Sequence, residues 1–387
     1  MNFKIGFIGM LILFAILEST TASALPAFAR KNNLQCSACH TAFPALTAMG
    51  REFMEAGYRF PGSAVGDLKV TDKLQFDKNF PMSLALIARP YTDSKEGETE
   101  IRAIHEGEIY AAGEIFNNIS GMMEVESEGE DGFGLVLSMA HITYNQSQAL
   151  NVQTGYGPTM MADPYDTYSD IRRLTATHYA LLNQTFGNTD NGDKLRHARQ
   201  QFSVFGRPTK QLFYYAGVGG LTGDLVGSDS SVLFGRIAFD IAPGMMLGAL
   251  ILDGDCEISD CPAASKARNF TRSAIDGQFD IGELRLTGVY MQAKDDTDAG
   301  GDVSNNSYYL QGYYRVMKNG RPTLVPLLRL GSYEANDGND TYSLATANLS
   351  YYLDENVKGF IEYQDIYDTP TGVPKDNVTT VQVEIVF

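Results

Sequence analysis

From about residue 80 to the C-terminus, apolar and polar residues alternate with the period of two that β-strands require, since neighbouring side chains of a strand point to opposite faces. The last segment, 378–387, shows the alternation most clearly. Valine, isoleucine and phenylalanine occupy alternate positions on one face of the predicted strand, and Thr380, Gln382 and Glu384 occupy the other. Most of the chain is therefore predicted to form strands with one apolar and one polar face.

Turn-forming residues divide this region into segments of roughly 8 to 13 residues. A soluble sandwich would show the same alternation. The lengths of the connections distinguish the two folds, because a membrane barrel has short turns on one side and long loops on the other. Short turns are predicted at 116–118, 145–148, 207–210, 242–244, 280–282, 318–322 and 353–356. Long loops are predicted at 92–103, 126–132, 157–198, 222–230, 256–266, 295–305, 334–340 and 368–377.

This order predicts an all-β fold in which about sixteen antiparallel strands close into a transmembrane barrel, with both ends on the periplasmic side. The aromatic C-terminal residue, Phe387, resembles the end of the final strand in bacterial outer-membrane barrels. We expect the chain to lie among the lipids of the outer membrane of a Gram-negative bacterium. The net charge of -17 argues against binding to nucleic acid, which needs a basic surface.

The longest loop, 157–198, lies where a porin-like barrel often folds a loop inward as a constriction. A charged gate or metal-sensing surface in the lumen is one interpretation, and a solvated outer loop is the favoured one. The ionisable residues that suggest a gate are Asp163, Asp166, Asp170, Arg172, Arg173, His178 and His197.

The N-terminus has the pattern of a secretory signal peptide over residues 1–24: Lys4, an apolar run, then Ala22-Ser23-Ala24 as a cleavage site. The mature chain would then begin at Leu25, although an uncleaved anchor stays open. An exported chain meets an oxidising compartment, in which paired cysteines can form disulfides. Cys256 and Cys261 flank four residues of a predicted outer loop, and we expect them to form a disulfide.

The other two cysteines belong to the sequence Cys36-Ser37-Ala38-Cys39-His40, the C-x-x-C-H pattern of c-type haem attachment. Two thiols at this spacing reach the two vinyl groups of one haem, and the adjacent imidazole binds the iron. A thioredoxin-like redox motif would need a surrounding βαβ pattern, and a zinc knuckle would need a second ligand pair nearby. The motif therefore predicts one covalent haem c, held by Cys36 and Cys39, with His40 as the proximal iron ligand.

The ligand on the far side of the iron is not fixed by the pattern, and a methionine generally gives a higher potential than a second histidine. Met49 and Met54 lie on a helix predicted over 43–56, where Met49 faces the packing side. Met82 opens the first predicted strand, and His141 lies near the periplasmic end of the fourth. Met82 and Met54 are the favoured candidates, and both remain hypotheses.

The residues from Ala24 to Arg30, the CSACH motif, the Phe-Pro-Ala-Leu run at 43–46 and Gly50 resemble the fused monohaem cytochrome and porin proteins of outer membranes, including the iron oxidases of iron-oxidising bacteria. The resemblance is detailed over residues 24 to about 60. The rest of the chain resembles the family only in being a porin-like barrel. Met49 stands where that family often has phenylalanine. The resemblance implies a small α-helical cytochrome segment over 25–79 that plugs a porin-like barrel over 80–387.

The resemblance further implies electron transfer across the outer membrane, with extracellular Fe(II) as the donor, a periplasmic cytochrome c as the acceptor, and Fe(II) oxidase as the enzymatic activity. Two alternatives stay open: a conduit for another donor or acceptor, and a haem-plugged porin that conducts solutes. Acidic loops could concentrate Fe(II) by attraction, but keeping the surface solvated is the favoured role. These loop residues are Glu124, Glu126, Glu128, Glu130 and Asp131, and also Asp295, Asp296 and Asp298.

Overall fold

The computed structural model describes most of the chain, and the predicted signal peptide at 1–24 lies outside the described residues. The described ranges are 27–60, 68–69, 75–76, 82–95, 97, 99–116, 118–129, 132–159, 163–165, 173–177, 195, 197–223, 226–227, 229–257, 267–297 and 299–387. Within them, no helix is long and apolar enough to cross a membrane.

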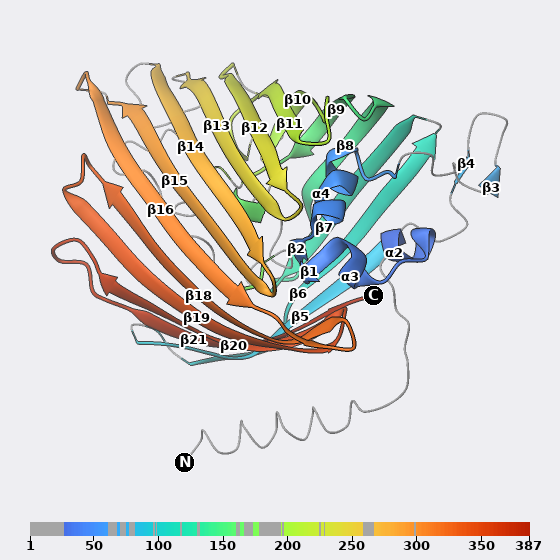
Figure 1. Cartoon of the computed structure of the whole chain (residues 1–387). Coiled ribbons are helices and arrows are strands. Elements are labelled where there is room, and N and C mark those ends of the chain that lie inside the picture. Colours follow the sequence, from blue (N-terminus) through green and yellow to red (C-terminus); the bar gives the residue numbers. More distant parts are fainter. Residues whose placement is uncertain are drawn as a thin grey trace, which may run out of the picture.

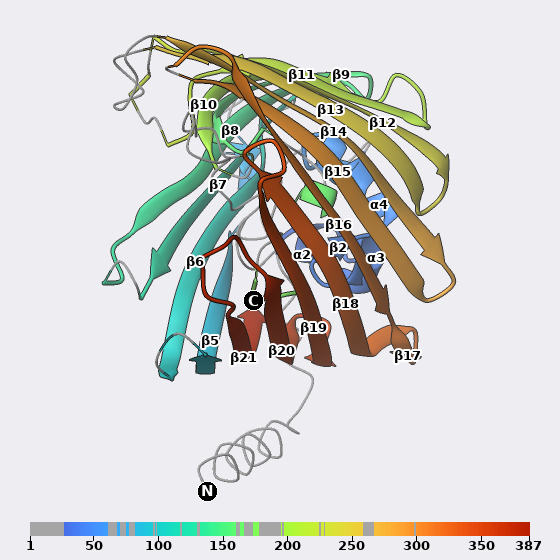
Figure 2. The same cartoon turned by 90° about the vertical axis from the view of Figure 1, so that its left-hand side faces the viewer.

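The C-terminal four-fifths of the chain forms antiparallel strands, each paired with its neighbours in sequence (Figures 1 and 2). The strands are β5 (Met82–Ser94), β6 (Glu100–Phe116), β7 (Ile119–Glu128), β8 (Val136–Ser147), β9 (Leu150–Gly157), β10 (Arg199–Gly206), β11 (Leu212–Gly219), β12 (Val232–Ala242), β13 (Met245–Cys256), β14 (Arg268–Ile281), β15 (Leu284–Asp296), β16 (Asp302–Tyr314), β17 (Val316–Lys318), β18 (Arg321–Ala335), β19 (Asp340–Asp354), β20 (Val357–Asp368) and β21 (Asn377–Val386).

The sheet closes on itself because β21 pairs with β5, from Val378 opposite Ser94 to Val386 opposite Ala85. Among the described residues the barrel has sixteen long strands, and the three-residue β17 only prolongs the hairpin between β16 and β18. The predicted fold class, a closed antiparallel barrel of about sixteen strands, is confirmed. Closure leaves no unpaired edge, which a membrane-spanning sheet cannot tolerate.

The outer face of the barrel is apolar and its inner face is polar, as the alternation predicts. On β12, for example, Leu233, Ile237 and Phe239 are 61, 52 and 51% exposed, whereas Arg236 between them is 4% exposed. On β21 the polar face predicted from sequence, which includes Gln382, points inward and is buried. The exposed apolar face matches hydrocarbon, and the buried polar face must be covered by something inside the barrel.

The strands run further than the apolar alternation suggested. The predicted loop 92–103 shrinks because β5 continues to Ser94 and β6 begins at Glu100, and the predicted loop 126–132 begins later because β7 continues to Glu128. Ladder hydrogen bonds prolong these strands beyond the lipid-facing belt, where apolar residues are no longer needed. The predicted loops 295–305 and 334–340 shrink in the same way, to 297–301 and 336–339, so this part of the prediction is wrong. Elsewhere along the barrel, short turns and longer loops alternate as predicted.

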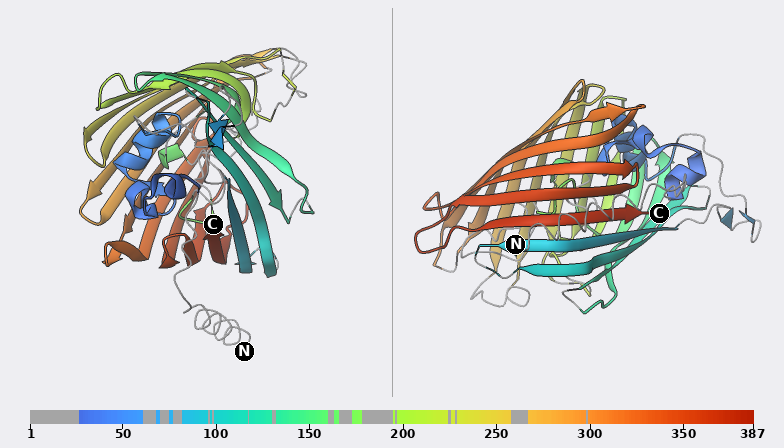
Figure 3. Two further views of the ribbon diagram at one scale, coloured as in Figure 1. Left: turned by 90° about the vertical axis from the view of Figure 1, so that its right-hand side faces the viewer. Right: turned by 90° about the horizontal axis from the view of Figure 1, so that it is seen from below.

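The N-terminal segment forms a plug, defined here as residues 27–60, in the mouth of the barrel at its short-turn end (Figures 1 and 3). It contains α2 (Ala27–Asn32), α3 (Cys36–Cys39), β1 (His40–Ala42), β2 (Ala45–Leu46) and α4 (Ala48–Glu55). Two further short strands, β3 (Leu68–Lys69) and β4 (Gln75–Phe76), pair with each other; in the sequence they lie between the plug and β5.

The helix predicted over 43–56 is shorter than expected, and this part of the prediction is wrong. α4 begins only at Ala48, because the hydroxyl of Thr47 accepts a hydrogen bond from the Gly50 N–H at 3.0 Å and caps the helix there. The preceding residues form the β1–β2 hairpin instead, in which His40 lies opposite Leu46.

Candidate functional site

The C-x-x-C-H motif forms one helical turn followed by an extended residue. Cys36 and Cys39 are the first and last residues of α3, and both are free thiols. Cys36 is 6% exposed, and burial, followed by the nearby carboxylates of Glu355 and Asp354, raises the pKa of its thiol to about 12. Burial also raises the pKa of the Cys39 thiol, so in both cysteines this fold favours the neutral thiol.

The imidazole of His40 is oriented by the plug itself. Its Nδ1 lies 2.8 Å from the carbonyl oxygen of Pro44, and its ring lies edge-on to Phe43 with the centroids 4.9 Å apart. A proton on Nδ1 donates to that carbonyl and places the lone pair of the neutral ring on Nε2. Histidines that bind a metal through Nε2 are usually held in this way. Two free thiols beside such an imidazole fit the donor set of a c-type haem.

The helix α4 supports the motif from one side at very short range. A Cβ atom added to Gly50 would lie 2.1 Å from the carbonyl oxygen of Cys39, so only glycine allows α4 to approach α3 this closely. The hydroxyl of Thr47 also donates to the carbonyl of Ala38 at 2.9 Å. Gly50, which contributes to the family resemblance, therefore has a packing role directly behind the motif.

The barrel holds the motif through residues at the short-turn ends of its strands. The carboxylate of Glu355, in the turn between β19 and β20, accepts from the Cys36 N–H at 2.7 Å and from the Ser37 hydroxyl at 2.8 Å. Tyr352 on β19 donates to the carbonyl of Phe43 at 2.7 Å. Two further contacts complete this side: the hydroxyls of Thr41 and Tyr313 at 2.7 Å, and Arg285 donating to Leu46 O at 2.8 Å.

The opposite side of the plug is held by buried charges. Arg51 and Glu55 project from one face of α4 towards the barrel: Arg51 contacts Asp240 at 2.6 Å, and Glu55 pairs with Arg207. Arg207 also contacts Asp240 at 2.7 Å. Burial alone would lower the pKa of Arg207, but the carboxylates of Glu55 and Asp240 outweigh that effect and raise it.

A third group of contacts joins the start and the end of the plug to β5, β6 and β7. The pairs are Ala27 N to Ser83 Oγ at 2.8 Å, Arg30 to Met82 O at 2.5 Å, Lys31 and Arg59 to Glu114 at 3.1 and 2.5 Å, and Ser120 Oγ to Gly57 O at 2.7 Å. The plug is therefore attached around the inner wall and not at a single hinge.

The residues that could bind the iron of a haem as a second ligand lie in different surroundings. Met54 is 4% exposed in the apolar cluster of the plug with Phe53 and Tyr58. Met82 is half-buried at the start of β5, and its carbonyl accepts from Arg30. His141 on β8 stacks on the ring of Tyr58 with the centroids 6.2 Å apart. Neither Met82 nor Met54 is set apart as the ligand by these contacts, so both remain predictions.

Parts of the longest loop fold into the barrel, so the favoured expectation of a solvated outer loop is wrong for them. The helical turn η1 (Asp163–Tyr165) lies inside the barrel (Figure 3), where Tyr165 donates to Asp276 at 2.8 Å and Tyr309 donates to Pro164 O at 2.6 Å. Asp166, Asp170, Arg172 and His178 lie outside the described residues, and His197 is exposed.

A second buried part of this loop, residues 173–177, is called the strap. Both carboxylate oxygens of Glu362 are engaged by it: Ala176 N at 3.1 Å, Thr177 N at 2.9 Å and Thr177 Oγ1 at 2.7 Å. Arg329 donates to Thr177 O at 3.0 Å, and Lys358 donates to Arg173 O at 2.8 Å. The strap reaches the plug, because Leu174 shares an apolar cluster with Ala42. The plug thus occupies the short-turn end of the lumen, and η1 and the strap lie further inside the barrel.

Several acidic residues predicted in solvated loops lie instead on strands and face inward, so that expectation is wrong for them. Glu124 is fully buried on β7, Glu126 and Glu128 are half-buried on the same strand, and Asp295 is buried on β15 beside Arg272 at 3.0 Å. The strands continue further than predicted and carry these side chains into the lumen. Asp296 lies at the end of β15 and accepts from Asn269; Glu130, Asp131 and Asp298 lie outside the described residues.

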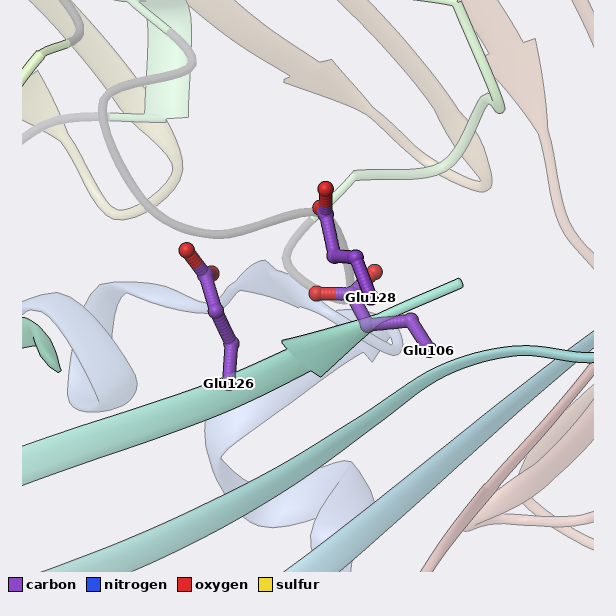
Figure 4. A group of neighbouring side chains, drawn as sticks. All are labelled: Glu106, Glu126 and Glu128. Carbon is purple, nitrogen blue, oxygen red and sulfur yellow. The ribbon is translucent and has the colours of Figure 1, made fainter. Parts of the chain in front are cut away.

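Three luminal carboxylates on neighbouring strands come close together (Figure 4). Glu106 lies directly opposite Glu128 in the register of β6 and β7, and the ligand atoms of Glu106, Glu126 and Glu128 all lie within 4.8 Å of one another. The sequence did not suggest this group. Its signal is the repeat of glutamate at every second position on both strands of one hairpin, which becomes a cluster only when the register is known.

Cys256, at the end of β13, is disulfide-bonded, in agreement with the prediction for this residue. Its predicted partner, Cys261, lies outside the described residues.

Comparison with known proteins identifies the fold of the barrel. An anion-selective porin from Comamonas acidovorans matches with 13% identity and a TM-score of 0.61, over 79% of this chain and 98% of that one. OmpF of Salmonella typhi, solved with daunomycin, matches with 13% identity and a TM-score of 0.58, over 79% and 97%. OprB of Pseudomonas putida matches with 12% identity and a TM-score of 0.56, over 87% and 96%.

No family profile and no curated protein matches the sequence. At these identities the solved structures establish the fold alone: a porin-like barrel. The closed barrel and its exposed apolar face confirm the predicted location in the outer membrane of a Gram-negative bacterium, in contact with its lipids.

Proposed function

We propose that this chain is an outer-membrane electron-transfer protein, a fusion of a monohaem cytochrome segment with a porin-like barrel. Cys36 and Cys39 would hold one haem c, and His40 would be its proximal iron ligand. The observation that carries the proposal is the orientation of His40, whose Nδ1 lies 2.8 Å from Pro44 O next to two free thiols. A plug that served only to block the barrel would require neither feature.

A bound haem supplies a one-electron redox centre, and the residues of this chain determine where that centre lies. The plug lies in the short-turn mouth, which is periplasmic in an outer-membrane barrel. A periplasmic cytochrome c could therefore approach this end and accept electrons. The hydrocarbon core is about 30 Å thick, so a donor from outside must enter the lumen or reach the centre through the loop segments that fill it.

We further propose extracellular Fe(II) as the donor, in which case the protein is an Fe(II) oxidase that receives one electron from each ion. The luminal carboxylates of Glu106, Glu126 and Glu128 support a cationic donor, because oxygen ligands and negative charge raise the local concentration of divalent cations. The formal net charge of -17 acts in the same direction.

The test uses the purified full-length protein in detergent. After denaturing electrophoresis, covalently bound haem should still be detectable on the polypeptide. Anaerobic addition of Fe(II) at the growth pH of the source organism should then convert the oxidised haem spectrum to the reduced one. A haem that dithionite reduces but Fe(II) does not would exclude iron as the donor, and protein without covalent haem would exclude the proposal as a whole.

The second candidate is a porin that conducts solutes, and the fold comparison favours it, since the matching structures are porins. The contacts inside the barrel argue against free passage of solutes, because both the plug and the strap occupy the lumen through specific hydrogen bonds. Ion conductance in planar bilayers separates the two: a porin conducts in its native form, and a plugged electron carrier does so poorly.

A further inference from the structure

The residue that joins the haem-binding turn to the barrel is Glu355, whose partners in the plug are 319 and 318 positions away in sequence. Its side chain is 9% exposed, and its Oε1 lies 3.9 Å from Nε of the exposed Arg321. Arg321 also pairs with Asp354 at 2.8 Å, so the two carboxylates and one guanidinium leave a net negative charge beside the motif. One carboxylate oxygen accepts from the backbone N–H of Cys36 and the other from the hydroxyl of Ser37. Gln35, the residue before α3, makes no side-chain hydrogen bond that would cap the helix. The barrel therefore supplies the cap that the plug lacks.

The turn that carries Glu355 is itself held firmly. The carboxylate of Asp354 accepts from the Glu355 N–H at 2.8 Å. Asn356 is bound to the last strand in both directions: its carbonyl accepts from Val386 N at 3.0 Å, and its side chain donates to Val386 O at 2.6 Å. The carboxylate is thus presented from a fixed point of the barrel wall, which a long, mobile side chain on a free loop could not achieve.

We propose that Glu355 is a positioning residue for the haem-binding turn and that its negative charge lowers the reduction potential of the haem. The inference rests on the proposed function. The carboxylate fixes Cys36 through a charge-assisted hydrogen bond, which is stronger than a neutral one. A fixed negative charge beside the motif also stabilises the oxidised haem, which carries one more positive charge than the reduced haem.

The effect of the charge and the effect of the hydrogen bonds can be separated by two substitutions. Glu355→Gln keeps the length of the side chain and one acceptor oxygen but removes the charge. Ser37→Ala removes one of the two hydrogen bonds and leaves the charge in place. The matched control is Glu283→Gln: Glu283 also lies in a short turn, where it pairs with Arg315 at 3.2 Å instead of contacting the motif.

The reduction potential of each full-length variant is measured by spectroelectrochemical titration of the haem bands. We expect the reduction potential of Glu355→Gln to be more positive than that of the wild type. The potentials of Ser37→Ala and Glu283→Gln should match the wild-type value. A potential of Glu355→Gln equal to that of Glu283→Gln, with haem bound in both, would overturn the inference and leave the proposed function intact. A wild type that carries no haem overturns both.

Limited proteolysis of the plug provides the second measurement and does not depend on the haem bands. Loss of a charge-assisted hydrogen bond should expose the plug roughly tenfold more often in Glu355→Gln, since such bonds contribute about 1.5 kcal/mol or more. Ser37→Ala should show a smaller increase. If Glu355→Gln is cleaved no faster than Glu283→Gln, Glu355 does not position the plug.

Discussion

The Nδ1 atom of His40 lies 2.8 Å from the carbonyl oxygen of Pro44, four residues further along the chain. The hydrogen bond joins the imidazole to the turn of the β1–β2 hairpin and so fixes the orientation of the ring relative to α3. Both partners belong to the plug, so the orientation of the proposed iron ligand is a local property. The barrel instead controls where the plug lies, through contacts such as that between Glu355 and Cys36.

The first prediction concerns the three motif residues. His40→Ala should retain covalent haem at Cys36 and Cys39 but change its visible spectrum, because the proximal ligand is missing. Cys36→Ser with Cys39→Ser should abolish covalent attachment. Haem staining after denaturing electrophoresis and visible spectroscopy measure the two effects. Haem that stays on the polypeptide in the double serine variant would contradict the assignment of these cysteines.

The second prediction concerns pH and the haem-free protein. The pKa of the Cys36 thiol is raised from 9.0 to about 12, chiefly by burial. A raised pKa in the folded state means that the neutral thiol stabilises the plug: the contribution is complete below pH 9 and is lost as the pH rises towards 12. At pH 8, iodoacetamide should therefore alkylate Cys36 much more slowly in the folded protein than in urea. Equal rates would show that the thiol is accessible and not perturbed.

The third prediction concerns the buried ion pair between Arg207 and Glu55. Arg207→Ala leaves a buried carboxylate without its main partner, which costs about 3 to 5 kcal/mol. We expect the plug to become far more sensitive to protease in detergent, with the barrel intact. Lys294→Ala is the control: Lys294 and its partner Asp302 are 52 and 53% exposed, so the change should be at most about 1 kcal/mol. Equal sensitivity of the two variants would contradict the role of this pair.

Much of the fold follows from local pattern. The alternation along 378–387 predicts β21 because the two faces of that strand meet different surroundings. Cys36, Cys39 and His40 lie within five consecutive residues, so the motif can be identified without knowledge of the fold. The contacts made by Glu355 could not be predicted, because its partners are more than 300 positions away and depend on barrel closure. The sequence predicts loops at Glu126 and Glu128, because lumen-facing positions at strand ends carry no apolar signal.

The fourth prediction concerns the second axial ligand. If Met82 binds the iron, Met82→Ala should change the haem spectrum and lower the reduction potential, while Met54→Ala should mainly destabilise the plug, because Met54 is buried in its apolar cluster. The reverse pattern would identify Met54 as the ligand. Met49→Ala is the control: Met49 is 39% exposed, so the expectation that it faces the packing side of the helix is wrong, and Met54 packs there instead. Unchanged spectra in both Met82→Ala and Met54→Ala would exclude this pair and direct attention to His141.

The last prediction separates the two proposed functions through the strap. Glu362 binds Thr177 through N and Oγ1 at 2.9 and 2.7 Å, and Arg329 donates to Thr177 O at 3.0 Å. Glu362→Ala removes charge-assisted hydrogen bonds that together contribute about 3 kcal/mol, so the strap should leave the wall roughly 100-fold more often.

Planar-bilayer conductance measures the result. If the lumen is filled so that electrons but not solutes pass, the wild type should conduct weakly, and Glu362→Ala should show frequent openings. Asp302→Ala removes the same charge from an exposed outer position and should behave as the wild type does. A wild type that already conducts at the level of an open porin, with no change in Glu362→Ala, would favour solute transport, because the strap would then not limit the passage of ions through the barrel.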